Sequence, residues 1–254
     1  MDPFKGIAKT LTESLHLSTP PVAVSFTDTP PAGVSPLSQP APAGCAFWER
    51  GALGAFVTSP KDHEKCAIGM YTHHMPLDTA SRKKDLNDCL KVFGDLGYVR
   101  PEDVPGIPTL KQEAKYVTYA PLSSTPLPPN VVLVFADSRQ SLAITEAVQQ
   151  VDSGVPPAMG RPACAVIPQT ANSSRPALSL GCCGARTYLN VLTDDIALWA
   201  LPGEKIGAYA DRIKVLTEAN DILTKFHQLR RKDVEEGKSP SVEQSLARLQ
   251  GSTG

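Results

Sequence analysis

The sequence predicts a mixed α/β (or α+β) fold in which helices flank a mixed sheet. Two short β-branched runs, over 22–26 and 131–135, are typical of buried strands. The second is followed by a helical pattern over 139–151, which makes a strand-then-helix unit. Apolar residues at helical spacing over 203–233 predict a long amphipathic helix. We therefore expect one domain over 1–236 and a flexible polar tail over 237–254.

The remaining elements follow from periodicity and from turn residues. Helices are expected over 3–16, 45–57, 82–96, 139–151 and 203–233, and strands over 22–26, 115–120, 131–135, 177–180 and 196–201. The 24 prolines gather in 19–42, 101–129 and 156–176, which predicts long irregular connections there. Cys66 is expected in a loop after Ser59-Pro60, and a polar loop is expected after residue 167.

Composition and charge exclude several classes of protein. With 41% hydrophobic and 20% charged residues over 254 positions, the chain can bury a core. A formal net charge of −1 leaves no electrostatic footprint for nucleic acid or for an anionic membrane. The N-terminus lacks the apolar stretch of a secretory signal, and no segment has the length of a membrane span. We expect a cytoplasmic protein, whose six cysteines are metal ligands, reactive thiols or core fillers rather than disulfides.

The two parts of the chain share a rough plan. In the first, a strand leads through a loop to Cys45, and Cys66 follows after a gap of 20 residues. In the second, a strand leads through a helix to Cys164, and Cys182 follows after a gap of 17 residues. We hypothesise two pseudo-symmetric half-repeats, over about 15–115 and 116–206, whose cysteine pairs meet across a pseudo-twofold axis.

Most of the cysteines lie at the expected end of an element and next to small residues. These are Cys45, Cys66, Cys164, Cys182 and Cys183. Small residues such as Gly69 and Gly184 let a backbone approach an inorganic centre and donate N–H groups to its sulfurs. Adjacent side chains point apart, so one of Cys182 and Cys183 is expected to reach the centre. Cys89 lies mid-helix among apolar residues and is expected to fill the core.

The spacing of the cysteines leaves the chemistry open. The chain has no C-x-x-C repeat of the kind that marks zinc sites and ferredoxin-type clusters. One alternative is a zinc site that combines Cys66 with nearby histidines, which are His63, His73 and His74. Another is a metal-free thiol redox sensor built on the vicinal cysteine pair.

An ordered series of short motifs carries a resemblance to a known family. In the first half the motifs are Pro20-Pro21-Val22-Ala23-Val24, Cys45 with Ala52 and Gly54, and Cys66-Ala67-Ile68-Gly69. In the second half they are Ala120-Pro121-Leu122, Pro129-Asn130-Val131-Val132-Leu133-Val134, Cys164-Ala165, Ser179-Leu180-Gly181-Cys182-Cys183-Gly184-Ala185-Arg186 and Leu201-Pro202-Gly203. Over residues 15–206 the chain resembles the domain of unknown function 169 family.

This resemblance implies an oxygen-sensitive [4Fe-4S] cluster, because the family has recurrent cysteines and is found largely in anaerobic bacteria and archaea. The positions that match these cysteines are Cys45, Cys66, Cys164 and Cys182, with Cys183 as an extra thiol that can exchange roles with Cys182. A redox or Lewis-acid enzyme acting on a small molecule, or electron transfer to a partner protein, would follow. Arg186, His73 and His74 are then the candidates to orient or protonate the substrate.

The chain departs from the family in one loop. Residues 70–75 stand where the family often has a glycine-rich stretch, so we expect a different substrate. The sequence does not fix the oligomeric state, and a homodimer is compatible with it.

Overall fold

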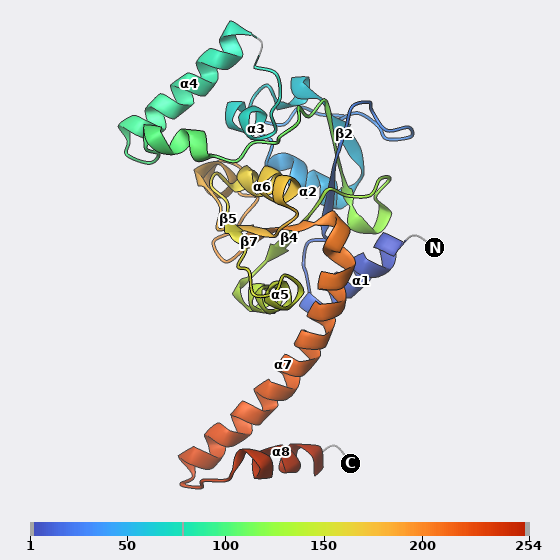
Figure 1. Ribbon diagram of the computed structural model, residues 1–254, viewed down its shortest axis with the longest axis vertical. Helices are drawn as coiled ribbons and strands as arrows, with labels where there is room; N and C mark the ends of the chain where they lie inside the picture. Colours follow the sequence, from blue (N-terminus) through green and yellow to red (C-terminus); the bar gives the residue numbers. More distant parts are fainter. Residues whose placement is uncertain (1–2, 78, 252–254) are drawn as a thin grey trace.

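The computed structural model describes residues 3–77 and 79–251 and has helices on both faces of one sheet (Figure 1). Within these residues the sheet has seven strands in the order β2-β3-β1-β4-β7-β6-β5. Neighbouring strands are antiparallel except β5 and β6, which are parallel. The expected mixed α/β class is therefore confirmed. Residues 1–2 of the expected domain and 252–254 of the expected tail lie outside the described residues.

Strands and helices alternate along most of the chain. The strands are β1 (Val22–Thr27), β2 (Phe56–Thr58), β3 (Tyr116–Pro121), β4 (Val131–Ala136), β5 (Ala158–Met159), β6 (Ala177–Ser179) and β7 (Ala197–Pro202). The α-helices are α1 (Pro3–Leu15), α2 (Ala46–Leu53), α3 (Ala67–Thr72), α4 (Ala80–Asp95), α5 (Ser138–Val151), α6 (Val166–Ser173), α7 (Ile206–Glu235) and α8 (Val242–Gly251). Shorter helical turns include η2 (Pro101–Gly106), η4 (Ala163–Ala165) and the π-helical η5 (Gly184–Tyr188).

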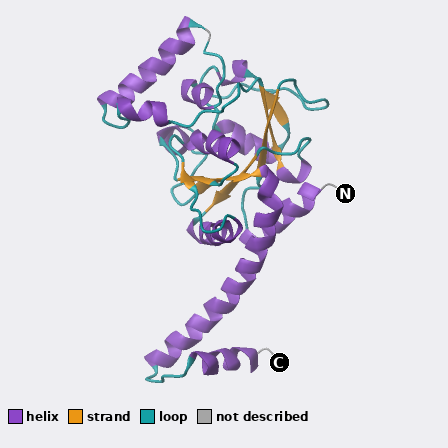
Figure 2. Ribbon diagram, viewed as in Figure 1, coloured by secondary structure: helices purple, strands orange, loops and turns teal. Residues whose placement is uncertain are grey.

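The central strand β4 divides the core into two layers. Val131 and Leu133 point to one face of the sheet, and Val132 and Val134 point to the other, as the period of a strand requires. Helices α2 and α6 cover the first face, and α1, α5 and α7 cover the second (Figure 2). Because both faces are covered, β4 is a continuous apolar run rather than an alternating one.

Without β5, the sheet consists of two sets of three strands with the same internal order. In each set the first strand along the chain lies at the centre of the sheet, the last lies next to it, and the middle one lies outermost. β1 and β4 are antiparallel neighbours at the centre, β3 and β7 flank them, and β2 and β6 come next. Cys45 precedes the helix before β2, and Cys164 precedes the helix before β6. Cys66 follows β2, and Cys182 follows β6. If the chain contains two half-repeats, this strand order places the boundary between them after β3, and not at residue 115 as expected from the sequence. The duplication itself stays a hypothesis.

Three segments differ from the expected secondary structure. The helix expected over 45–57 ends at Leu53, and the next strand-forming residues make β2. Cys66 does not lie in a loop, because it caps the short helix α3. The polar loop expected after residue 167 is helix α6, whose Pro168 lies in the first turn, where the helix needs no backbone N–H.

Helix α7 leaves the body of the protein and continues well beyond it (Figure 1). The segment after residue 237, expected to be a flexible tail, contains helix α8. Arg248 Nη1 donates to the carboxylate of Asp233 at 2.7 Å, and Asp233 is only 1% exposed. We call α7 from residue 214 onward, together with α8, the C-terminal arm. Among the described residues, no helix is both long and apolar enough to cross a membrane.

Candidate metal centre

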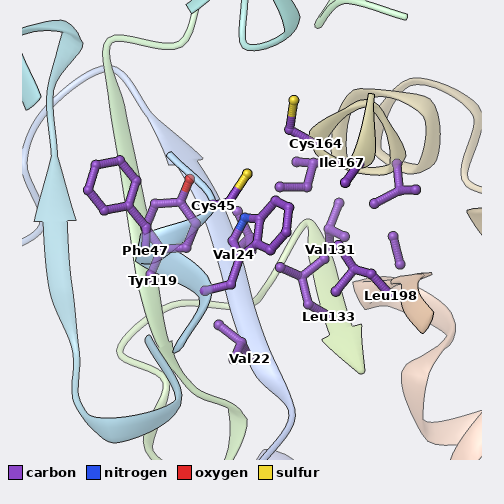
Figure 3. Packing of buried hydrophobic residues seen from close by; sticks show 14 of the residues in the cluster. Val22, Val24, Cys45, Phe47, Tyr119, Val131, Leu133, Cys164, Ile167 and Leu198 are labelled. Atoms are coloured by element: carbon purple, nitrogen blue, oxygen red, sulfur yellow. The ribbon is translucent and has the colours of Figure 1, made fainter. Parts of the chain in front are cut away.

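Cysteines from distant parts of the chain line one cavity of about 670 Å³. They are Cys45, Cys66, Cys89, Cys164, Cys182 and Cys183, and all are free thiols. Figure 3 shows Cys45 and Cys164 on the same side of the sheet, with both sulfur atoms directed away from Leu133. The fold thus brings together the five cysteines that the sequence places at a metal centre, and it adds Cys89.

Cys45 and Cys164 are the most buried of these thiols, each 7% exposed. Cys45 directly precedes α2, and Cys164 lies in the turn η4 that leads into α6. Alanine follows each of them in the sequence. Thr72 Oγ1 donates a hydrogen bond to Cys164 Sγ at 3.5 Å. Both cysteines line the cavity, and both belong to the core cluster on the first face of the sheet.

A contact with the backbone of α3 positions Cys66. Gly69 N donates to Cys66 Sγ at 3.3 Å. A Cβ atom at position 69 would lie 2.9 Å from that sulfur, which is closer than real side chains approach. Only glycine therefore lets this sulfur lie against the first turn of α3. The sequence predicts that Gly69 donates its N–H to a sulfur atom, and the contact with Cys66 Sγ is of this kind.

The vicinal cysteines differ in burial. Cys182 is half-buried and packs against the core cluster of the first face, whereas Cys183 is exposed. A Cβ atom at Gly184 would lie 3.8 Å from Cys182 Sγ, which is an ordinary contact. Position 184 is therefore less constrained by a sulfur atom than position 69. Of the two thiols, Cys182 is the one that lies nearer the buried end of the cavity.

Burial and mutual repulsion raise the pKa of Cys45, Cys66 and Cys164, which favours the protonated thiols when no cation is present. Desolvation raises the pKa of Cys164, and negative charge on Cys66 or Cys182 would raise it further. The pKa of Cys45 is raised well above its usual value, first by burial and then by repulsion from Cys164. Burial also raises the pKa of Cys66, although backbone N–H groups partly oppose this. A cation among the sulfurs would reverse the balance, because it stabilises thiolates.

The two predicted catalytic histidines do not line the cavity. His74 Nδ1 donates to the Leu110 carbonyl at 2.9 Å. His73 is 2% exposed; its Nδ1 donates to the Gly69 carbonyl at 3.0 Å, and its Nε2 has no partner among the described residues. Desolvation lowers the pKa of His73 to about 4, so the ring is neutral at pH 7. The ring of His63 lies 5.6 Å away, centroid to centroid, and burial also lowers its pKa. His73 is thus buried beside the cavity, whereas His74 is exposed, and their expected contact with a substrate stays a prediction.

Arg186, the third catalytic candidate, holds a loop together. Its Nε donates to the Leu180 carbonyl at 2.6 Å and its Nη2 to the Ile196 carbonyl at 3.1 Å. Its Nη1 donates to the Thr193 carbonyl. All three nitrogens are thus engaged by backbone oxygens, and the side chain does not line the cavity. Arg186 acts as a positioning residue for the segment that carries Cys182, which differs from the expected contact with a substrate or a cluster.

A cap over the cavity, formed by residues 80–106, is the feature that sequence reasoning missed. It contributes Cys89, Phe93 and Tyr98 to the lining. Cys89 is half-buried and faces the cavity, which corrects its expected place in the core. The guanidinium of Arg161 lies 4.3 Å from the centre of the Tyr98 ring and also donates to the Tyr98 carbonyl. Helical spacing in the sequence predicts the apolar face of α4, but it does not show that this face lies over a cavity instead of the core.

The donor set of the cavity is rich in sulfur. The thiols share one cavity and lie within electrostatic reach of one another. Thiolates are ligands both of zinc and of iron–sulfur clusters. In the described part of the chain, no three or more His, Cys, Asp or Glu side chains are arranged to hold one metal ion.

Comparison with protein families agrees with the sequence motifs. The family model of domain of unknown function 169 (DUF169), described as uncharacterised ArCR, matches residues 10–212. The chain belongs to this family. The DUF169 match includes the whole sheet and all six cysteines, and it ends before the C-terminal arm. No curated protein and no solved structure matches the chain.

Proposed function

We propose that this DUF169 protein binds a [4Fe-4S] cluster through Cys45, Cys66, Cys164 and Cys182 and acts on a small molecule in the cytoplasm. The convergence of these four thiols, two from each half of the sheet, on one cavity carries the proposal. Burial raises the pKa of Cys45, Cys66 and Cys164, which favours their neutral form, and thiolates this close together would repel one another. A centre that supplies positive charge and fills the space between them would stabilise all four.

The surroundings of the thiols suit a cluster. Donors near cluster sulfurs stabilise the centre and tune its reduction potential. Gly69 N–H and Thr72 Oγ1 already contact the sulfurs of Cys66 and Cys164. The apolar side chains of the first core layer exclude water from the buried end of the cavity. When bound, the cluster would supply electron transfer or, with one iron lacking a cysteine ligand, a Lewis acid.

The cavity extends from the thiols to the cap, which leaves room for a small molecule beside the cluster. The cap side chains Leu90 and Phe93 and the adjacent Ile107 line that part, and Arg161 and Asp103 add charged groups. A lining of this kind suits a small molecule with an apolar part and a few polar groups. We therefore favour an oxidoreductase or lyase, and a redox partner protein is the alternative for the same cluster.

Anaerobic purification and single substitutions test this proposal. The expected preparation is brown, holds about four irons and four sulfides per chain, and gives an EPR signal on one-electron reduction. Single Cys→Ala variants at the four ligand positions are expected to lose most of the iron. Cys89→Ser and Cys183→Ser are the matched controls, because they alter thiols of the same cavity that the proposal leaves unligated, and both are expected to retain it.

Several outcomes would contradict the proposal. Protein without iron and sulfide after anaerobic reconstitution would overturn it. One zinc per chain without sulfide would favour the zinc-binding module instead. Fast alkylation of Cys182 or Cys183 that chelators leave unchanged would favour the thiol redox sensor. Loss of iron in Cys183→Ser together with retention of iron in Cys182→Ala would show that Cys183, and not Cys182, is the fourth ligand.

A further inference from the structure

Helix α7 carries a heptad pattern over the part that leaves the body. Along one face, residues recur at alternating spacings of four and three, in the series Val215, Ala219, Ile222, Phe226, Leu229 and Asp233. This spacing forms a single stripe on the helix, as at the contact line of a coiled coil. We call this stripe the seam. It begins beyond residue 212, where the DUF169 match ends.

Helix α8 covers only the distal part of the seam. Phe226 is 7% exposed and Asp233 is 1% exposed, where α8 packs against α7. In contrast, Val215 is 49% exposed and Ile222 is 58% exposed. Asn220 and Asp221 still lie near Glu146 and Arg139 of α5 on one side of the helix, but residues 221–225 are exposed without exception. An exposed apolar stripe on such a helix indicates a surface that another chain covers.

The charges beside the seam indicate what that chain is. Residues seven positions apart along one flank are Asp211, Glu218, Lys225 and Lys232, and all four are exposed. The order is two acids followed by two bases. When two identical helices pack antiparallel, this flank of one copy lies along the same flank of the other copy, with the residue order reversed. Glu218 then faces Lys225 of the second copy, Asp211 faces its Lys232, and each pair occurs twice.

The other flank and the seam give the same register. When Glu218 faces Lys225 of the second copy, Leu223 of that copy lies beside the solvent-facing edge of Leu216, which otherwise packs on the second core layer of its own chain. In the seam, the small Ala219 then lies opposite the large Ile222. Leu223 is 45% exposed in the single chain, so this register covers it as well. Charge, apolar contact and side-chain size therefore agree on one antiparallel arrangement.

We propose that two copies of this chain associate through their C-terminal arms, antiparallel and centred between Ala219 and Ile222. The face of α7 that packs on the body begins with Tyr209 and Ile213, which are buried in the second core layer. Val215 is two positions beyond Ile213 and therefore points away from the body. The two bodies lie at opposite ends of the pair and leave the seam accessible. The arrangement does not depend on the proposed cluster.

Sedimentation of the full chain tests the association. The chain has a mass of 27.1 kDa, and we expect a dimer of twice this mass at micromolar concentration. Ile222→Asp is expected to give a monomer with nearly unchanged helix content, because Ile222 contacts solvent in the single chain, and its thermal unfolding is expected to lose the concentration dependence of the dimer. Leu53→Asp is the matched control: Leu53 is 88% exposed on the body, and the variant is expected to remain dimeric.

A charge exchange tests the register. Glu218→Lys and Lys225→Glu each place like charges opposite one another twice, and each is expected to weaken the dimer by about tenfold or more. An equimolar mixture of the two variants restores opposite charges and is expected to form heterodimers preferentially. Lys214→Glu, an exposed charge on the same helix but off the flank, is the control and is expected to leave the dissociation constant unchanged.

Three results would overturn the proposal. The first is a full chain that sediments as a monomer up to about 100 μM. The second is an Ile222→Asp variant that associates as the wild type does. The third is a mixture of the two charge variants without preferential pairing, which would exclude the antiparallel register.

Discussion

At the scale of single residues, position 69 controls where a thiol lies. Gly69 donates its N–H to Cys66 Sγ at 3.3 Å, and the space that a methyl group would need is taken by that same sulfur. The glycine is required by steric contact and not by backbone conformation, since position 69 lies within α3.

Gly69→Ala is expected to displace the Cys66 sulfur, because the new Cβ would lie 2.9 Å from it. We expect iron incorporation under anaerobic reconstitution to fall several-fold while cooperative unfolding is retained. Gly6→Ala in α1, where nothing lies within 4 Å of the added atom, is the control. It is expected to retain iron and to stabilise the helix by up to about 1 kcal/mol. Equal iron in both variants would show that the contact does not position Cys66.

His73 makes the protein sensitive to acid. Its pKa of about 4 in the folded chain lies below the ordinary value of 6.5. Between these pH values the unfolded chain binds a proton that the folded chain does not bind. The free energy of unfolding therefore falls as pH decreases from 6.5 toward 4, by about 3 kcal/mol for the full shift.

Urea unfolding at a series of pH values between 7 and 4 measures this loss. His73→Gln removes the titrating ring and is expected to give a shallower pH dependence than the wild type. His63, whose pKa burial also lowers, accounts for the part that remains. If the free energy of unfolding of His73→Gln depends on pH as steeply as that of the wild type, the pKa of His73 is not lowered in the folded protein.

At the scale of elements, the cap is held to the body by few contacts. Arg161 stacks on the Tyr98 ring and donates to the Tyr98 carbonyl, which ties the cap to the segment before Cys164. Helix α4 also packs on α3, and Arg82 of α4 forms an ion pair with Glu64 of the body. Exposed apolar residues on the outer side of the cap, such as Leu96, do not contribute to holding it.

Arg161→Ala is expected to open the cap more often. An exposed cation–π contact contributes about 0.5–1 kcal/mol, so alkylation of Cys66 and Cys89 in the cluster-free protein should accelerate by about two- to fivefold. Faster hydrogen exchange in α4, without a change in β4, would accompany it. Arg175→Ala, at an exposed arginine outside the cap, is the control. Unchanged alkylation in Arg161→Ala would show that the cap is held elsewhere.

Elements with strong local signals could be predicted from sequence, and those fixed by tertiary contacts could not. The apolar run of β4 and the stripe of α7 give their positions within a few residues. Strand β2 was missed because its three residues pair with β3, which is distant in sequence. Helix α8 was missed because Arg248 and the buried Asp233, which hold it to α7, lie 15 residues apart.

At the scale of the whole molecule, the two halves share one sheet and one core. β1 and β4 pair directly, and Val22 of β1 lies in the same core cluster as Leu133 of β4. The cysteine set could be predicted as a group because five of the six cysteines have small neighbours. The surroundings of Arg186 and of the histidines could not be predicted because sequence does not show which backbone oxygens fill their hydrogen-bonding capacity. Cys89 was expected in the core because a helix that faces the core and one that faces a cavity have the same spacing of apolar residues.

A shared sheet predicts that the halves unfold together. Trp48 belongs to the first half and Trp199 to the second, and both are buried. In Trp48→Phe the fluorescence reports on the second half, and in Trp199→Phe it reports on the first. Within each variant we expect urea unfolding followed by fluorescence and by far-ultraviolet circular dichroism to have the same midpoint. Separate midpoints would indicate that the halves are independent folding units.

The division of the cysteines between the halves also sets when the site can exist during translation. Cys45 and Cys66 leave the ribosome more than a hundred residues before Cys182, and β7, which pairs with both β4 and β6, follows later still. A nascent chain that ends before residue 182 therefore lacks one of the four proposed ligands, and one that ends before residue 197 also lacks the strand that joins β4 to β6. The wall of the cavity that contains Cys182 is thus completed last.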